Sequence, residues 1–108
     1  MDSDEFFNID VKKVITFLKT RTISKNKFTI NKITKKRIAA IIVVNVWGNG
    51  IDLEDLTKIC KKKNIKIIED SSEALGTFIK KGKFKDTHVG TNSYIGCLSF
   101  NGNKIITA

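Results

Sequence analysis

Two carboxylates stand where a short strand ends, and their type and position suit binding or catalysis. Glu69 and Asp70 directly follow the β-branched run of Ile65, Ile67 and Ile68, which is typical of a buried strand. In an open parallel sheet, ligands bind beyond the carboxyl ends of the strands. Asp70 is therefore the first candidate for a functional group. In the alternative interpretation, the pair only ends the strand and begins a turn.

A lysine occupies a similar position near the end of the chain. Tyr94–Phe100 is expected to form a buried strand, and Asn101–Asn103 has the composition of a turn, so Lys104 follows a strand end. The alternative for Lys104 is an ordinary solvated lysine. Between the two candidates, Leu75–Lys83 favours another short strand, and the single histidine, His88, is interpreted as a loop side chain rather than an acid–base catalyst.

A strand–helix–strand unit positions the first carboxylates. Ile38–Val46 is apolar except for one asparagine, as in strands that are covered on both faces. Trp47–Gly50 forms a turn, and Asp52 is expected to cap a helix over Leu53–Lys63. The strand that begins at Ile65 follows directly, so the two strands are expected to be parallel with a right-handed crossover. Neither is followed by G-x-G-x-x-G, so dinucleotide binding is not supported.

The N-terminal part has weaker signals. Apolar residues at helical spacing predict a helix over Val11–Thr20, capped by Asn8 or Asp10. The basic segment Arg21–Arg37 is expected to be a surface excursion with a short hairpin that turns at Asn31–Lys32.

Composition limits the function classes. The chain has 108 residues, of which 41% are hydrophobic, and a net charge of +9. The charge invites a nucleic-acid interpretation, but all the basic residues except Arg21 and Arg37 are lysines, scattered along the chain. Cys60 and Cys97 have no metal-ligand spacing and are expected to be buried thiols in a reducing cytoplasm, with no metal and no membrane span.

Two motifs, in order and at fitting distance, resemble one enzyme family. IIEDSSEALG followed by CLSFNGNKIIT is similar to the DegT/DnrJ/EryC1/StrS sugar aminotransferases. AIIVVNVWGNGIDLEDL resembles the family stretch that precedes the Glu-Asp pair. The resemblance covers Ile38–Ala108 well and implies a three-layer α/β fold with a mostly parallel sheet, the large domain of a pyridoxal-phosphate-dependent transferase. SFNGNKIIT is most like enzymes that aminate nucleotide-linked 4-keto sugars.

The resemblance implies a role for four residues. Lys104 matches the lysine that forms the internal Schiff base and then moves the proton, a role that a dry pocket favours. Asp70 matches the carboxylate that pairs with the pyridine nitrogen and keeps the ring protonated. Ser99 matches a serine that contacts the cofactor phosphate. Glu73 matches a position beside the ring oxygen, where a carboxylate disfavours the phenolate, so Glu73 is expected to be protonated or turned away.

The sequence also departs from the family pattern. Val43 and Asn45 replace the usual proline and histidine, and Asn92–Tyr94 stands where a Gly-Asp pair is usual. Family members are several times longer and build each active site across a homodimer interface. The chain is therefore expected to be a fragment, residues 1–108, of the cofactor-binding large domain, without the N-terminal segment and the C-terminal small domain.

The implied function is amination of a nucleotide-linked keto sugar with an amino donor such as glutamate, in the cytoplasm, for cell-surface polysaccharide or glycan precursors. A fragment of this length is expected to be inactive alone. The alternative from another class is a small basic module that binds nucleic acid or protein without catalysis.

Overall fold

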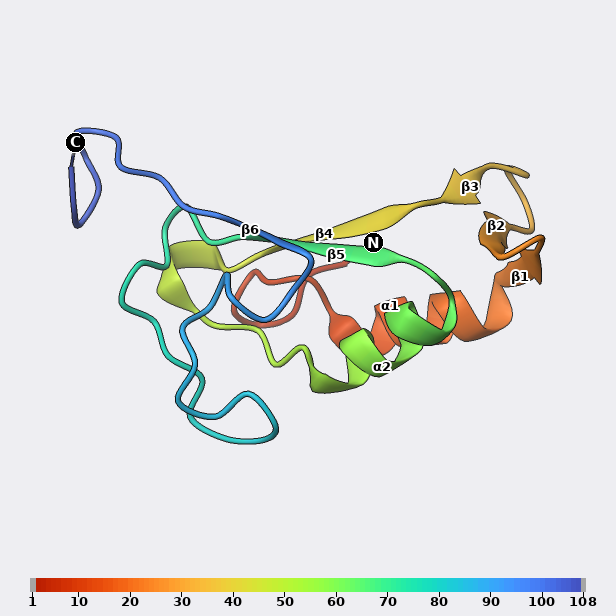
Figure 1. Cartoon of the computed structure of the whole chain (residues 1–108), viewed down its shortest axis with the longest axis horizontal. Helices are drawn as coiled ribbons and strands as arrows, with labels where there is room; N and C mark the ends of the chain where they lie inside the picture. The colour runs from red at the N-terminus through yellow and green to blue at the C-terminus, as the bar shows by residue number, and fades with distance from the viewer. Residues whose placement is uncertain (1, 108) are drawn as a thin grey trace.

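The computed structural model describes residues 2–107, which extend over 43 × 28 × 25 Å. A three-stranded parallel sheet lies at the centre, in the order β4-β5-β6, and a small antiparallel sheet, β1-β2-β3, lies at one end of the long axis. The C-terminal segment lies at the opposite end (Figure 1). The expected α/β class with a mostly parallel main sheet is confirmed.

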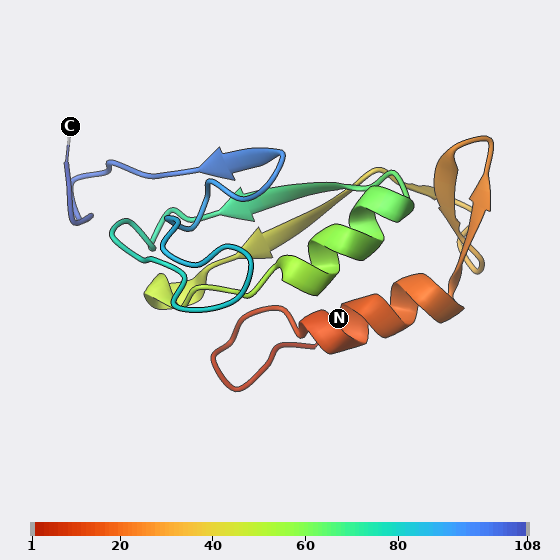
Figure 2. The ribbon, with the colours of Figure 1, turned by 60° about the horizontal axis from the view of Figure 1, so that its bottom comes forward.

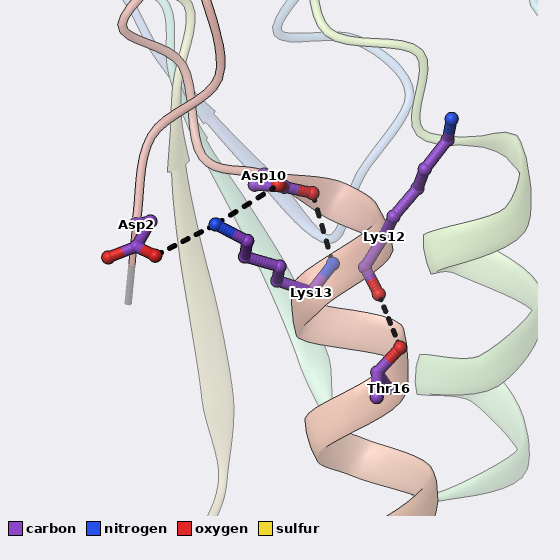
Figure 3. Close-up of polar contacts among 5 residues, drawn as sticks. All are labelled: Asp2, Asp10, Lys12, Lys13 and Thr16. Carbon is purple, nitrogen blue, oxygen red and sulfur yellow. Dashed lines mark hydrogen bonds and ion pairs between the residues drawn. The ribbon is translucent and has the colours of Figure 1, made fainter.

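The first helix has the predicted bounds. α1 spans Val11–Thr20, and the Asp10 carboxylate caps it by accepting a 3.0 Å hydrogen bond from the backbone N–H of Lys13 (Figure 3). Val14 and Leu18 lie on its buried face. The helix therefore forms because one apolar stripe is buried and its first turn is capped.

Lys13 of α1 also binds the loop that precedes the helix. Lys13 Nζ donates to Asp2 Oδ2 at 2.8 Å (Figure 3), and this contact lowers the pKa of the Asp2 carboxyl. Within the loop, the Asp4 carboxylate accepts hydrogen bonds from the backbone N–H groups of Phe6 and Asn8. The segment thus holds a defined turn ahead of the helix.

The basic segment folds differently from the prediction. β1 (Thr22–Lys25) and β2 (Phe28–Asn31) form an antiparallel hairpin, and β3 (Arg37–Ile38) pairs with β2. The hairpin turns at Asn26–Lys27, not at Asn31–Lys32. Both turn residues have left-handed backbones, φ 49° and 66°, which match the twist of a two-residue hairpin.

The strand–helix–strand unit is confirmed. β4 (Ala40–Val44) and β5 (Lys66–Asp70) pair in parallel, and α2 (Glu54–Lys62) connects them. β4 is shorter than predicted, because Ile38 pairs instead in the small sheet. β5 continues through both carboxylates, so Glu69 and Asp70 are the last strand residues and do not stop the strand before them.

The ends of α2 differ from the prediction by one residue. Leu53 takes the cap position without a side-chain bond, while Asp52 Oδ1 accepts a 3.0 Å bond from the Glu54 N–H. At the other end, Asn64 has φ 52°, which lets the chain turn back into β5.

The last strand is short and exposed. β6 (Ile95–Cys97) pairs in parallel with β5, and all three of its residues are exposed, so the prediction of a buried strand over Tyr94–Phe100 was wrong in length and burial. The strand predicted in Leu75–Lys83 does not form. This stretch is a loop with one isolated bridge, from Phe78 to His88.

One face of the parallel sheet carries the core. α1 and α2 lie together against this face (Figure 2), where Val43 and Ile67 are buried. On the opposite face, Ile42, Val44 and Ile95 are exposed, and Ile42 is 62% exposed. The expectation that β4 is covered on both faces was therefore wrong for the described residues.

The two cysteines have different surroundings. Cys60 is buried in the core, and loss of hydration raises the pKa of its thiol to about 11. Cys97 is free and exposed on β6, so the expectation of a buried thiol holds for Cys60 and fails for Cys97. Among residues 2–107, no helix is long and apolar enough to cross a bilayer.

Candidate functional site

The carboxyl ends of the three parallel strands form the platform of the site. Val44, Asp70 and Cys97 lie in one row across the sheet, each at or next to the end of its strand. The backbone N–H of Ser71 donates to the Cys97 carbonyl at 2.8 Å, so the strand ends stay paired up to this row. All three strands point toward the end of the molecule that carries the C-terminal segment (Figure 2). The crevice expected beyond the strand ends therefore lies there.

The two neighbouring carboxylates point to opposite faces of the sheet, as alternation along a strand requires. Glu69 is 1% exposed, and its oxygens accept hydrogen bonds from the backbone N–H of Gly90, at 2.7 Å, and of Asn92, at 3.2 Å. Asp70 is half-buried on the other face, and its Oδ1 accepts a 3.1 Å bond from the Ser72 N–H. Glu69 thus stabilises the loop that contains Gly90 and Asn92, while Asp70 remains available to the site.

A cavity of about 260 Å³ gathers three of the four predicted site residues. Lys104, Glu73 and Ser99 line it together, and Ser72 contributes to the same wall. The Lys104 side chain is 20% exposed, and its Nζ lies 3.6 Å from Glu73 Oε1. Asp70 does not line this cavity but adjoins it through its bond to the Ser72 N–H.

The lysine is positioned by the predicted turn. The backbone N–H of Lys104 donates to the Asn101 carbonyl at 2.9 Å, which closes the turn after β6. Asn101 Nδ2 donates to Asn103 Oδ1 within the turn. This arrangement bends the chain back, so that Lys104 reaches the loop that follows β5.

The apolar wall of the cavity contains a residue that the sequence did not single out for chemistry. Trp47 lines the cavity with Leu75 and Ile105, and it is 69% exposed. It lies in the turn η1 (Val46–Gly48) that follows β4. The aromatic residue directly before a glycine is the available signal in the sequence, but the local pattern indicates only a turn there.

Asn45, at the position where the family usually has histidine, is a buried structural anchor. Its Nδ2 donates to Ser71 Oγ at 2.9 Å, and its Oδ1 accepts from the Ile51 N–H at 3.0 Å. These bonds join the end of β4 to the end of β5 and to the segment before α2. The departure from the family pattern is therefore accommodated by a satisfied amide network.

His88 lies in the loop, as predicted. Its Nε2 accepts a 2.7 Å bond from the Gly76 N–H, and its Nδ1 contacts the Val89 carbonyl. Both nitrogens hold the loop together, which leaves neither free for acid–base work in this arrangement.

The sheet, the loops at its carboxyl edge and the lysine cavity define an α/β protein with a candidate small-molecule site beyond the strand ends. Comparison with known proteins agrees: the model of the DegT/DnrJ/EryC1/StrS aminotransferase family matches residues 3–108. The chain belongs to this family.

Individual relatives match the same region. A Bacillus subtilis protein, provisionally named a pyridoxal phosphate-dependent aminotransferase, is 41% identical over 68 residues, which are 63% of this chain and 16% of the relative. The GDP-perosamine synthase of Escherichia coli O157:H7 is 41% identical over 76 residues, which are 70% and 19% of the two chains. The chain therefore spans less than a fifth of either relative.

A solved structure has the same fold. The crystal structure of the aminotransferase from Psychrobacter cryohalolentis superposes with a TM-score of 0.68 at 25% sequence identity. The match covers 98% of this chain and 22% of that chain. The α/β arrangement of strands and helices is thus that of part of an aminotransferase.

Proposed function

We propose that this chain is part of the cofactor-binding large domain of a pyridoxal-phosphate-dependent aminotransferase that acts on nucleotide-linked keto sugars. One observation carries the proposal. Ser99 and Lys104, from the segment after β6, and Glu73, from the loop after β5, line one cavity beside Asp70. These are the four residues that the family motifs assign to the cofactor.

The chemistry of the donor set fits pyridoxal phosphate. Lys104 offers an amine for the aldehyde, and Asp70 offers a carboxylate for the ring nitrogen. Hydroxyl groups of Ser72 and Ser99 are donors suited to a phosphate. Trp47 adds an apolar aromatic wall to the same cavity.

Each residue has a separate task in this proposal. When bound, the cofactor supplies an electron-accepting ring for the chemistry at the substrate carbon. Asp70 holds the proton on the ring nitrogen, because a carboxylate favours the charged form of a neighbouring base. Lys104 Nζ binds the cofactor and carries the proton between positions on the substrate. Glu73 holds Lys104 Nζ through their ion pair before the cofactor arrives.

The substrate class comes from the relatives. The name GDP-perosamine synthase describes an enzyme of nucleotide-linked sugar metabolism, and the second motif of this chain points to the same class. We therefore extend the proposal to a nucleotide-linked keto sugar as acceptor, glutamate or a similar amino donor, a homodimeric assembly and a cytoplasmic location. The assembly is part of the proposal because the family that the motifs resemble builds each active site across a homodimer interface.

The test is reductive trapping. The purified chain is titrated with pyridoxal phosphate, reduced with borohydride and digested, and the modified lysines are located by mass spectrometry. We expect Lys104 to be modified at lower cofactor concentration than exposed lysines such as Lys80, because only Lys104 has the rest of the site beside it. A visible absorbance band of lysine-bound cofactor is expected before reduction and is expected to be absent in Lys104→Ala.

The matched control is Lys80→Ala, which removes an exposed loop lysine and is expected to leave trapping at Lys104 unchanged. If Lys104 is modified no earlier than Lys80, the cavity does not select the cofactor. The proposal for this chain would then be rejected, and only the family membership would remain.

A further inference from the structure

Trp47 has a backbone conformation that is costly for its residue type. Its φ and ψ angles are 49° and 32°, in the left-handed region, which a bulky side chain rarely adopts. Such a conformation is unfavourable for a residue other than glycine and persists only where the surroundings impose it. The neighbouring Gly48 also has a left-handed φ, of 81°, which costs a glycine nothing.

The turn around Trp47 is fixed from both sides. Asn8 is buried and spans the turn: its Oδ1 accepts from the Val46 N–H at 2.9 Å, and its Nδ2 donates to the Asn49 carbonyl at 3.1 Å. On the other side, Thr77 Oγ1 donates to the Gly48 carbonyl at 2.9 Å. The segments of Asn8 and Thr77 therefore hold a conformation that a glycine at position 47 would adopt without strain.

Burial of the Trp47 side chain does not offset this backbone strain. Trp47 is 69% exposed, and its aromatic partner is Phe7, with ring centroids 5.3 Å apart and planes at 63°. Phe7 is also exposed and also has a left-handed φ, of 62°. Two strained, exposed aromatic residues thus lie side by side, and one of them, Trp47, lines the cavity that holds Lys104.

We propose that Trp47 is a positioning residue for the cofactor: its indole forms the wall against which the pyridoxal ring is held. This inference rests on the proposed function. Three observations support it: the strained backbone, the exposed indole and its place in the lining of the cavity that Ser99 and Lys104 also line. Phe7 holds the indole edge-on and limits its rotation.

Two substitutions at Trp47 distinguish the effect of the indole ring from that of the strained backbone. Trp47→Gly removes the indole and relieves the strained φ, whereas Trp47→Phe keeps an aromatic face. Cofactor affinity at Lys104 is measured by titrating the visible absorbance band, and stability is measured by urea unfolding. An aromatic contact contributes about 0.5–1.5 kcal/mol, so we expect Trp47→Gly to weaken cofactor binding about three- to tenfold. We expect Trp47→Phe to restore most of it.

The stability measurement excludes a purely structural role. We expect Trp47→Gly to keep or raise the urea midpoint, because strain relief opposes the loss of contact with Phe7. The matched control is Lys27→Gly, which relieves a left-handed residue (φ 66°) in the hairpin of the small sheet and is expected to leave cofactor binding unchanged.

Two results would overturn the inference while the proposed function survives. One is trapping at Lys104 with the same affinity in Trp47→Gly as in the unaltered chain. The other is a lower urea midpoint together with weaker binding that Trp47→Phe does not restore. If the unaltered chain shows no selective modification of Lys104, the proposed function and this inference both fail.

Discussion

Lys104 Nζ lies 3.6 Å from Glu73 Oε1, which joins the turn after β6 to the loop after β5. The ion pair holds the amine at the wall of the cavity. Glu73 is neither turned away from Lys104 nor enclosed, since its side chain is 47% exposed. Glu73 thus faces the lysine. The sequence-based expectation that Glu73 is protonated or turned away concerns the cofactor ring oxygen and stays a prediction.

Replacing Glu73 with glutamine tests what this ion pair does. An exposed pair of this kind contributes about 0.2–1 kcal/mol, and it must break before Lys104 binds the cofactor. We expect Glu73→Gln to raise the extent of borohydride trapping at Lys104 about 1.5- to fivefold at limiting pyridoxal phosphate. Raised ionic strength should reproduce part of this gain in the unaltered chain. A fall in trapping would instead assign Glu73 to cofactor binding.

Substitutions at the neighbouring residues Glu69 and Asp70 are expected to affect stability differently. Glu69→Ala leaves the backbone N–H groups of Gly90 and Asn92 without their buried acceptor, so we expect a loss of about 2–4 kcal/mol in the free energy of unfolding. Asp70→Asn keeps an oxygen for the Ser72 N–H, and we expect it to change this free energy by less than about 0.5 kcal/mol.

The same two variants separate folding from cofactor binding. Asp70→Asn is expected to weaken the visible band of bound pyridoxal phosphate, because it removes the charge that retains the ring proton. Urea unfolding and absorbance titration of both variants give the comparison. Equal losses of stability in the two variants would contradict the assignment of Glu69 to the loop and Asp70 to the site.

The parallel unit was predictable because its signals are local and agree with one another. The apolar run of β4, the amphipathic pattern of α2 and the β-branched run of β5 each specify one element, and their order specifies parallel pairing. The turn that carries Lys104 was predictable for the same reason, from Asn101–Asn103. These elements place the strand ends, and with them the site.

Features set by distant contacts were not predictable. The dipeptide Asn-Lys occurs at Asn26–Lys27 and again at Asn31–Lys32, and only the pairing of Thr22 with Asn31 places the hairpin turn at the first. Likewise, an apolar run cannot tell which segments cover its two faces, so the exposure of Ile42 was missed. The strained backbone of Trp47 is held by hydrogen bonds from separate segments, and the local sequence around Trp47 does not indicate it.

Gly96 is required where β6 passes the loop that Glu69 holds. A Cβ on Gly96 would stand 1.7 Å from the Gly90 carbonyl oxygen, which is backbone and cannot rotate away. We expect Gly96→Ala to lower the free energy of unfolding by at least about 2 kcal/mol, because β6 must move away from the loop. Cofactor trapping at Lys104 should fall as well, since β6 leads into its turn.

Gly102 is the matched control for this prediction. A Cβ there meets nothing within 4 Å, so we expect Gly102→Ala to change the unfolding free energy by less than about 0.5 kcal/mol. Urea unfolding of the two variants is sufficient for the comparison. A Gly96→Ala protein as stable as Gly102→Ala would contradict the close packing of β6 against the loop.

The buried thiol predicts a loss of stability in alkali. Burial raises the pKa of Cys60 to about 11, from 9.0 for an unperturbed thiol, so the folded state retains its proton at a pH where the unfolded state loses it. This contribution to stability is fully present below pH 9 and is lost as the pH rises toward 11.

We expect the urea midpoint of the unaltered chain to fall across this pH window more steeply than the urea midpoint of Cys60→Ala. Cys97→Ala, which alters an exposed thiol and leaves Cys60 in place, should keep the steep fall. Parallel pH profiles for the unaltered chain and Cys60→Ala would show that Cys60 is hydrated in the folded protein.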